Sequence, residues 1–103
     1  MNNAFNLLTS EQEKFLNFFK FRFPVFHKSN VFYRDLEYSI KYYLNSRNIE
    51  LSNKLLIQTT KDFIKHLEGN GILVYMSPLT WMLNYPEFST VIPVPAETAG
   101  ESK

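Results

Sequence analysis

The stretch Leu51–Met76, LSNKLLIQTTKDFIKHLEGNGILVYM, contains a helix, its stop signal and the start of a strand. Ser52 is a good helix N-cap, and apolar side chains follow it at helical spacing. The side expected to be buried carries Leu56, Thr60, Phe63 and Leu67. Gly69-Asn70-Gly71 ends the helix, because glycine and asparagine readily adopt the left-handed backbone of a helix C-terminus. Ile72–Met76 then has the composition of a largely buried strand.

This strand is expected to form a hairpin with the segment that follows it. Ser77-Pro78 predicts a turn, and Thr80–Tyr85 predicts an antiparallel partner strand. The alternative is a helical bundle in which residues 72–85 form no hairpin. The two possibilities differ in whether a small sheet completes the domain.

Two further helices are expected before Leu51. Ser10 and Glu13 have capping-box spacing, which predicts a helix that begins at Ser10 and ends near Phe23, because Pro24 disfavours helical geometry in the residue before it. Ser29-Asn30 predicts the N-cap of the next helix. The apolar stripe of that helix is expected to contain Phe32, Leu36, Ile40, Tyr43 and Leu44.

The size and composition predict one domain. The 103 residues are 45% hydrophobic and 17% aromatic, an aromatic content that so small a core cannot fully enclose. We expect an N-terminal arm at residues 1–9, the domain at 10–85, and an extended tail containing proline and alanine at 86–103. The chain has no cysteine, and we read neither a signal peptide nor an apolar run long enough to span a membrane, so a cytoplasmic location is expected.

The arrangement of three helices followed by a hairpin resembles the winged-helix fold. The resemblance covers roughly residues 10–85, and its motif-like part is the junction Leu67-Glu68-Gly69-Asn70-Gly71-Ile72. It implies a mainly α fold with a small two-stranded β wing. In DNA-binding members of this superfamily the third helix enters the major groove and a basic wing touches the DNA backbone or minor groove.

Charge is distributed unevenly along the chain. Residues 14–65 contain ten Lys or Arg against four Asp or Glu, whereas both ends of the chain are acidic. One hypothesis, implied by the resemblance, is therefore a DNA-binding transcriptional regulator, expected to be dimeric, that uses the basic face of the third helix. The residues assigned to that face and its surroundings are Lys41, Arg47, Lys54, Gln58, Lys61 and Lys65.

The wing favours a different function, since the chain contains no Lys or Arg between Lys65 and Lys103. Phosphate affinity grows with the number of cationic contacts, whereas aromatic residues and methionine are enriched in protein interfaces. Our leading hypothesis is a non-catalytic protein-binding module, a small accessory or structural subunit of a larger assembly. Its expected docking residues are Tyr75, Leu79, Trp81, Tyr85, Phe88, Val91, Pro93 and Pro95.

Catalytic and metal-binding signatures are missing from the sequence. The only imidazoles are His27 and His66, which lack the spacing of a paired metal site. The three glycines cannot build a glycine-rich phosphate loop. We therefore expect no enzyme activity, no metal and no cofactor.

Overall fold

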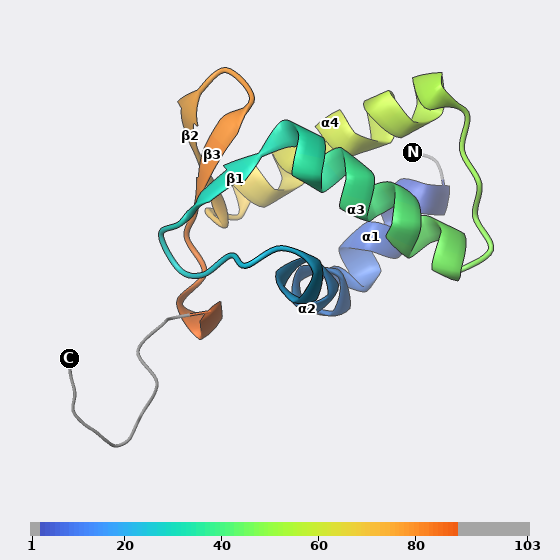
Figure 1. Cartoon of the computed structure of the whole chain (residues 1–103). Helices are drawn as coiled ribbons and strands as arrows, with labels where there is room; N and C mark the ends of the chain where they lie inside the picture. Colours follow the sequence, from blue (N-terminus) through green and yellow to red (C-terminus); the bar gives the residue numbers. More distant parts are fainter. Residues whose placement is uncertain (1–2, 89–103) are drawn as a thin grey trace.

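The computed structural model describes residues 3–88, which form four α-helices and a three-stranded antiparallel sheet (Figure 1). The expected mainly α class with a small sheet is confirmed, although the described residues contain four α-helices where three were expected and three strands where a two-stranded wing was expected. The elements are α1 (Asn3–Ser10), α2 (Gln12–Arg22), β1 (Asn30–Phe32), α3 (Tyr33–Ser46), α4 (Asn53–Gly69), β2 (Leu73–Ser77), β3 (Thr80–Leu83) and the short 3-10 helix η1 (Pro86–Phe88). None of the helices within residues 3–88 is long and apolar enough to cross a membrane.

The additional helix is α1, which occupies the stretch assigned from sequence to an N-terminal arm. It packs against α4 and buries Ala4 and Leu8 in the core. The expected capping box at Ser10 is wrong. Because Ser10 is itself the last residue of α1, its hydroxyl donates back to the carbonyl oxygen of Leu7 at 3.0 Å, and Glu11 takes the N-cap position of α2.

The C-terminal end of α2 agrees with the expectation. Phe23 follows the helix in an extended conformation, with φ −129° and ψ 134°, as the proline after it requires. The next helix, α3, begins at Tyr33 rather than directly after Ser29-Asn30, because residues 30–32 pair as β1 with β3. Phe32 is therefore an exposed strand residue instead of a member of the helical stripe, whose four other members are buried.

Helix α4 and the hairpin follow the prediction closely. The Ser52 hydroxyl accepts a hydrogen bond from the Leu55 amide at 3.3 Å, and Gly71 takes the left-handed conformation with φ +75°. Strands β2 and β3 pair in antiparallel register, which excludes the bundle without a hairpin. The expected burial of β2 is wrong, since only Leu73 among its five residues is buried. Strand β2 is an edge strand, and Figure 1 shows the hairpin projecting beyond the helices.

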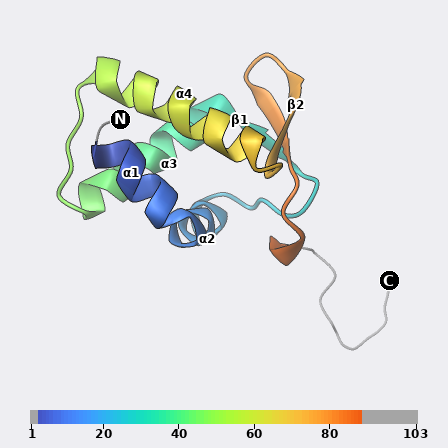
Figure 2. The ribbon, with the colours of Figure 1, turned by 180° about the vertical axis from the view of Figure 1, so that it is seen from behind.

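The sheet has the order β1-β3-β2 and lies at one end of the helical part, as both views show (Figure 2). Trp81 on β3 lies between Val31 of β1 and Tyr75 of β2 in the register. Side chains alternate across a strand, so these three residues share the face turned toward the helices. Inside the helical part, three phenylalanines are fully buried: Phe15, Phe19 and Phe63.

Candidate functional site: an apolar groove beside the fourth helix

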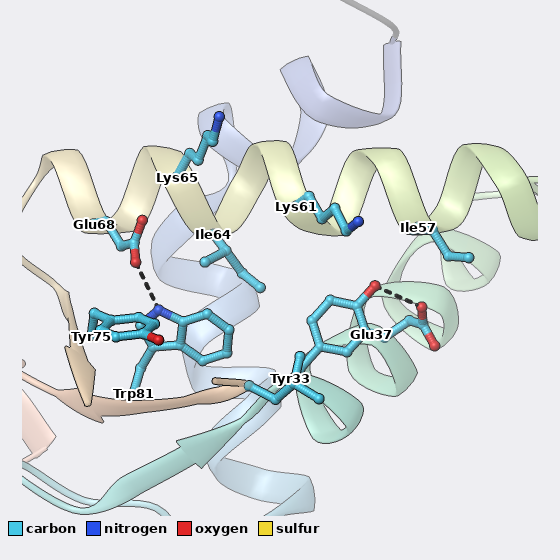
Figure 3. A pocket seen from close by; sticks show the side chains of 10 residues that line it. Tyr33, Glu37, Ile57, Lys61, Ile64, Lys65, Glu68, Tyr75 and Trp81 are labelled. Atoms are coloured by element: carbon cyan, nitrogen blue, oxygen red, sulfur yellow. Dashed lines mark hydrogen bonds between the residues drawn. The ribbon is translucent and has the colours of Figure 1, made fainter. Parts of the chain in front are cut away.

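A groove with a volume of about 560 Å³ lies between α4, the first turns of α3 and the β2–β3 hairpin (Figure 3). We call it the α4–hairpin groove. Its size is in the range of binding pockets, and most of its wall is aromatic or aliphatic. The aromatic and aliphatic residues that line it are Tyr33, Ile57, Ile64, Tyr75, Leu79 and Trp81. The charged residues that line it are Glu37, Lys61, Lys65 and Glu68.

Trp81 forms part of the floor of the α4–hairpin groove and belongs to the core of its own domain. Only 7% of its surface is exposed, and its indole Nε1 donates to Glu68 Oε2 at 2.7 Å (Figure 3). The hydrogen bond joins β3 to the last turns of α4 and satisfies the one polar atom of the ring. Trp81 therefore does not project as the exposed anchor expected from the sequence.

Tyr33 and Glu37 form the end of the groove that α3 contributes. They lie one turn apart on α3, and the Tyr33 hydroxyl donates to Glu37 Oε2 at 3.0 Å. Removal from water, and then the hydrogen bond and charge of Glu37, raise the pKa of Tyr33 to about 12. Both carboxylates of the groove thus already accept a hydrogen bond from an aromatic side chain of the same chain.

The hairpin side of the groove presents two exposed apolar residues. Leu79 at the turn is 62% exposed and Tyr75 on β2 is 59% exposed. Leu79 also has φ +64°, a left-handed conformation that is unfavourable for a leucine and costs about 1–2 kcal/mol. The turn thus holds a large apolar side chain in water on a backbone that glycine or asparagine would occupy with less strain. These two expected docking residues are accessible.

Lys61 and Lys65 flank the groove on the α4 side, one turn apart and exposed. Figure 3 shows Lys65 reaching outward from α4. Within residues 3–88 the only ion pair joins Arg47 and Glu11, so neither lysine has a carboxylate partner there. Lys54 and Gln58 continue the same exposed side of α4. The polar stripe predicted for this helix is therefore present on its surface.

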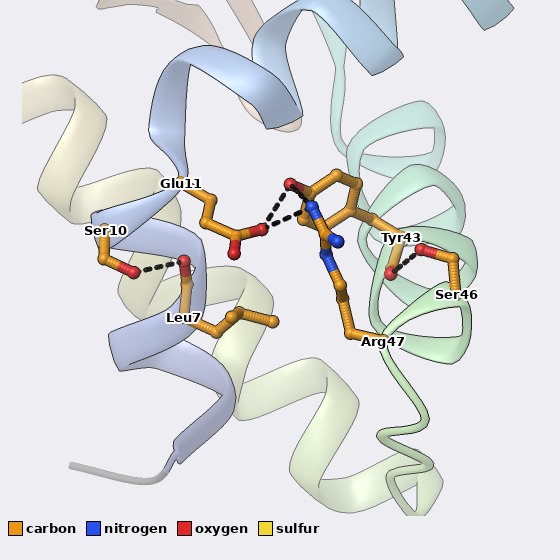
Figure 4. Close-up of polar contacts among 6 residues, drawn as sticks. All are labelled: Leu7, Ser10, Glu11, Tyr43, Ser46 and Arg47. Carbon is orange, nitrogen blue, oxygen red and sulfur yellow. Dashed lines mark hydrogen bonds and ion pairs between the residues drawn. The ribbon is translucent and has the colours of Figure 1, made fainter.

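Arg47 lies elsewhere and has a structural role. Its guanidinium Nη2 is 2.8 Å from Glu11 Oε1 and donates to the Tyr43 hydroxyl at 3.1 Å, while that hydroxyl donates to the same Glu11 oxygen at 2.6 Å (Figure 4). The cluster ties the α1–α2 junction to the end of α3, and the hydrogen bond from Tyr43 is the largest cause that lowers the pKa of Glu11. Lys41 is exposed on the second half of α3, beside Glu50 rather than in the groove. Arg47 therefore does not extend the α4 stripe, whereas Lys41 lines a small hollow together with Asn53 and Leu56 from the first turn of α4.

The residues after β3 also contribute to the core. Phe88 is 6% exposed, packs edge-on against Tyr85 with ring centroids 4.8 Å apart, and lies under the Lys20 ammonium. Its carbonyl accepts from the His27 amide at 2.8 Å, and His27 Nδ1 accepts from the Tyr85 amide at 3.1 Å. Phe88 is thus not free to dock, Tyr85 is half-buried, and the packed domain continues past residue 85. The other expected docking residues, Val91, Pro93 and Pro95, lie outside the described residues.

The second histidine has local partners. His66 Nε2 lies 2.9 Å from Gln12 Oε1 and 3.1 Å from Asn70 Nδ2, and the ring stacks on Phe63. Residues 3–88 contain no group of three or more His, Asp or Glu side chains arranged to hold a metal ion.

The sequence alone does not indicate that the residues lining the groove lie close together. Tyr33, Glu37 and Glu68 are not among the site residues expected from the sequence, because nothing local indicates that the first turns of α3 face α4 beside the hairpin. Ile57 offered a signal, since it is apolar yet lies beside the predicted buried side of α4. An exposed isoleucine next to two lysines on one helix is the pattern that an apolar groove with a cationic edge produces. Comparisons with protein-family models, curated proteins and solved structures found no match.

Proposed function

We propose that this chain is a non-catalytic protein-binding module with a winged-helix-like domain, acting in the cytoplasm as a small accessory subunit of a larger assembly. The observation that carries the proposal is the α4–hairpin groove, whose exposed edge is formed by Leu79 and Tyr75. The passage from α4 through Gly71 into a β hairpin supports the winged-helix resemblance. The docking surface differs from the one expected from sequence, because Trp81 forms its floor and Phe88 is excluded from it.

The domain leaves apolar residues of the groove in water, where a partner can bury them. Fully burying a leucine side chain contributes about 1.5–3 kcal/mol, so a partner covering Leu79, Tyr75 and Ile57 gains several kcal/mol before the costs of association. The left-handed backbone at Leu79 adds to this case. A strained, exposed leucine destabilises the isolated domain, which is understandable if its side chain serves a contact.

The test compares two exposed apolar residues. Leu79→Asn removes the proposed anchor and places a residue that tolerates positive φ at the turn. Phe21→Asn is the control, because Phe21 on α2 is 89% exposed and does not line the groove. The tagged full chain is isolated from its native cells at moderate salt, and the polypeptides that accompany it are identified by mass spectrometry.

We expect a stoichiometric polypeptide partner with the wild-type chain and with Phe21→Asn, and its loss with Leu79→Asn. Circular dichroism verifies that both variants are folded. Retention of the same partner by folded Leu79→Asn would refute docking at the groove. Trp81, the only tryptophan of the chain, also provides a direct reading, because its emission should change when the partner covers the groove.

The second candidate is a DNA-binding regulator, and the exposed stripe Lys54, Gln58, Lys61 and Lys65 on α4 supports it. Lysines on such a face suit phosphates, and the glutamine suits a base edge. This function predicts that nucleic acid accompanies the purified chain and is released steeply as salt is raised. A predominantly apolar contact depends much less on salt, so one salt series separates the two functions.

A further inference from the structure

We infer that the α4–hairpin groove binds a peptide segment that carries carboxylates beside its apolar side chains. The inference rests on the proposed protein-binding function and specifies the chemistry of the partner. Two properties of the groove lead to it. Apolar surface is left exposed along its length, and its carboxylates already accept hydrogen bonds within the chain whereas its lysines have no ion-pair partner among residues 3–88.

The apolar requirement comes from both sides of the groove. Ile57 on α4 is 42% exposed, and it lies across the hollow from Leu79 and Tyr75, with Trp81 and Ile64 lining the wall between them. A volume of about 560 Å³ accommodates several apolar side chains at once. The occupant must therefore present a row of aliphatic or aromatic residues rather than a single one.

The acidic requirement comes from the lysines. Glu68 accepts from Trp81 Nε1 and Glu37 accepts from the Tyr33 hydroxyl, so both carboxylates have donors within the chain. Lys61 and Lys65 have no ion-pair partner within residues 3–88, and each ammonium keeps its donors available. An approaching carboxylate gains a charged hydrogen-bond donor at this edge, where neither ammonium has an ion-pair partner in the described part of the chain, whereas Glu37 and Glu68 keep their negative charge but each already accepts one hydrogen bond.

The spacing of the two lysines adds a geometric condition. Residues four apart on a helix lie on the same side and are separated by about 6 Å along its axis. Figure 3 shows that the two side chains leave α4 in different directions, with Lys61 beside the hollow and Lys65 pointing away from it. A first carboxylate of the occupant would therefore meet Lys61, and a second one would have to lie outside the hollow to meet Lys65.

The experiment uses a displayed library of random peptides as the probe. The full chain is immobilised at moderate salt, peptides are selected, and those that also bind Leu79→Asn are discarded. We expect the remaining peptides to combine aliphatic or aromatic residues with Asp or Glu. Selected peptides should also quench or shift the emission of Trp81, since it lines the groove.

Matched charge variants then test the lysines. Lys61→Gln with Lys65→Gln should weaken the binding of a selected peptide about 2- to 30-fold, the range expected for losing two exposed ion pairs. Lys14→Gln with Lys28→Gln removes the same charge from exposed lysines outside the groove and should change the affinity less than about 2-fold. The difference between the two double variants should shrink as salt is raised.

The outcomes separate this inference from the proposed function. Groove-dependent peptides without acidic residues, or with affinities that Lys61→Gln and Lys65→Gln leave unchanged, overturn the inference and leave the protein-binding function standing. If no Leu79-dependent peptide is selected from the wild-type chain or from a variant in which Val91, Ile92 and Val94 are replaced by serine, the protein-binding function is contradicted as well.

Two other occupants would also overturn the inference. If peptides are selected only when Val91, Ile92 and Val94 are replaced by serine, the groove is taken by the chain's own tail. If the wild-type chain sediments as a dimer that Leu79→Asn dissociates, the groove is taken by a second copy.

Discussion

Replacing Trp81 by phenylalanine tests whether this residue stabilises its own domain, as its burial indicates. The substitution keeps an aromatic ring on the floor of the groove but removes the Nε1–H that donates to Glu68 at 2.7 Å. A hydrogen bond to a charged acceptor contributes about 1.5–3 kcal/mol, and the smaller ring also leaves part of its site unfilled. We expect a loss of about 2–3 kcal/mol in the free energy of unfolding.

The assay is thermal unfolding followed by far-ultraviolet circular dichroism, because the variant lacks the only tryptophan. For a domain of this size, a loss of that order lowers Tm by about 10–20 °C. Glu68→Ala and the double variant complete a cycle, in which the coupling energy between the two residues should reach about 1 kcal/mol or more. Tyr75→Phe is the control, since Tyr75 is exposed beside Trp81 in the register and should change the stability by less than about 0.5 kcal/mol.

Two results would refute this reasoning. A Tm for Trp81→Phe within about 4 °C of wild type would show that the buried indole contributes little to stability. A coupling energy near zero would show that the Trp81–Glu68 hydrogen bond does not join β3 to α4 in solution. In either case the role of Trp81 as an interface anchor would have to be considered again.

Three further predictions concern backbone conformation and ionisation. Gly71→Ala should lower the free energy of unfolding by about 1–2 kcal/mol, because the backbone φ of Gly71 is +75°. Gly69→Ala should leave that free energy unchanged or raise it by up to about 1 kcal/mol, because Gly69 lies in α4 and an added Cβ would meet no atom within 4 Å. Urea unfolding compares the two variants, and equal effects would contradict the left-handed conformation of Gly71. The pKa of Glu11 is lowered from its ordinary value of 4.5, chiefly by the Tyr43 hydrogen bond, so its stabilisation is present above about pH 4.5 and is lost as pH falls through the lowered pKa. Acid unfolding of Glu11→Gln should accordingly converge with that of wild type at low pH, and a constant difference would argue against the linkage. The Tyr33 hydroxyl should titrate with a pKa of about 12, so its contribution to the stability of the fold is present below pH 10 and is lost as pH rises toward 12. Ring-carbon NMR, with the Tyr33 signal assigned by Tyr33→Phe, checks this pKa, and titration near pH 10 would contradict it.

Only the tertiary structure decided which large apolar residues of the hairpin are accessible. Tyr75, Leu79 and Trp81 belong to one hairpin and read alike in the sequence, yet Trp81 is enclosed because β1 covers one side of it and Glu68 accepts its N–H. Strand β1 has three residues and pairs with a segment some fifty positions later in the chain. Such a pairing leaves no periodic signal in its own residues, so the Ser29-Asn30 region reads as a helix cap.

The sequence by itself determined α4, its cap at Ser52, its stop at Gly71 and the hairpin that follows. Each of these depends on interactions between residues within a few positions of one another, which local patterns describe well. The exposed lysine stripe of α4 was predictable for the same reason. The α4–hairpin groove was not, because its walls come from α3, α4 and the hairpin, and only their packing brings Tyr33, Ile57 and Leu79 around one hollow.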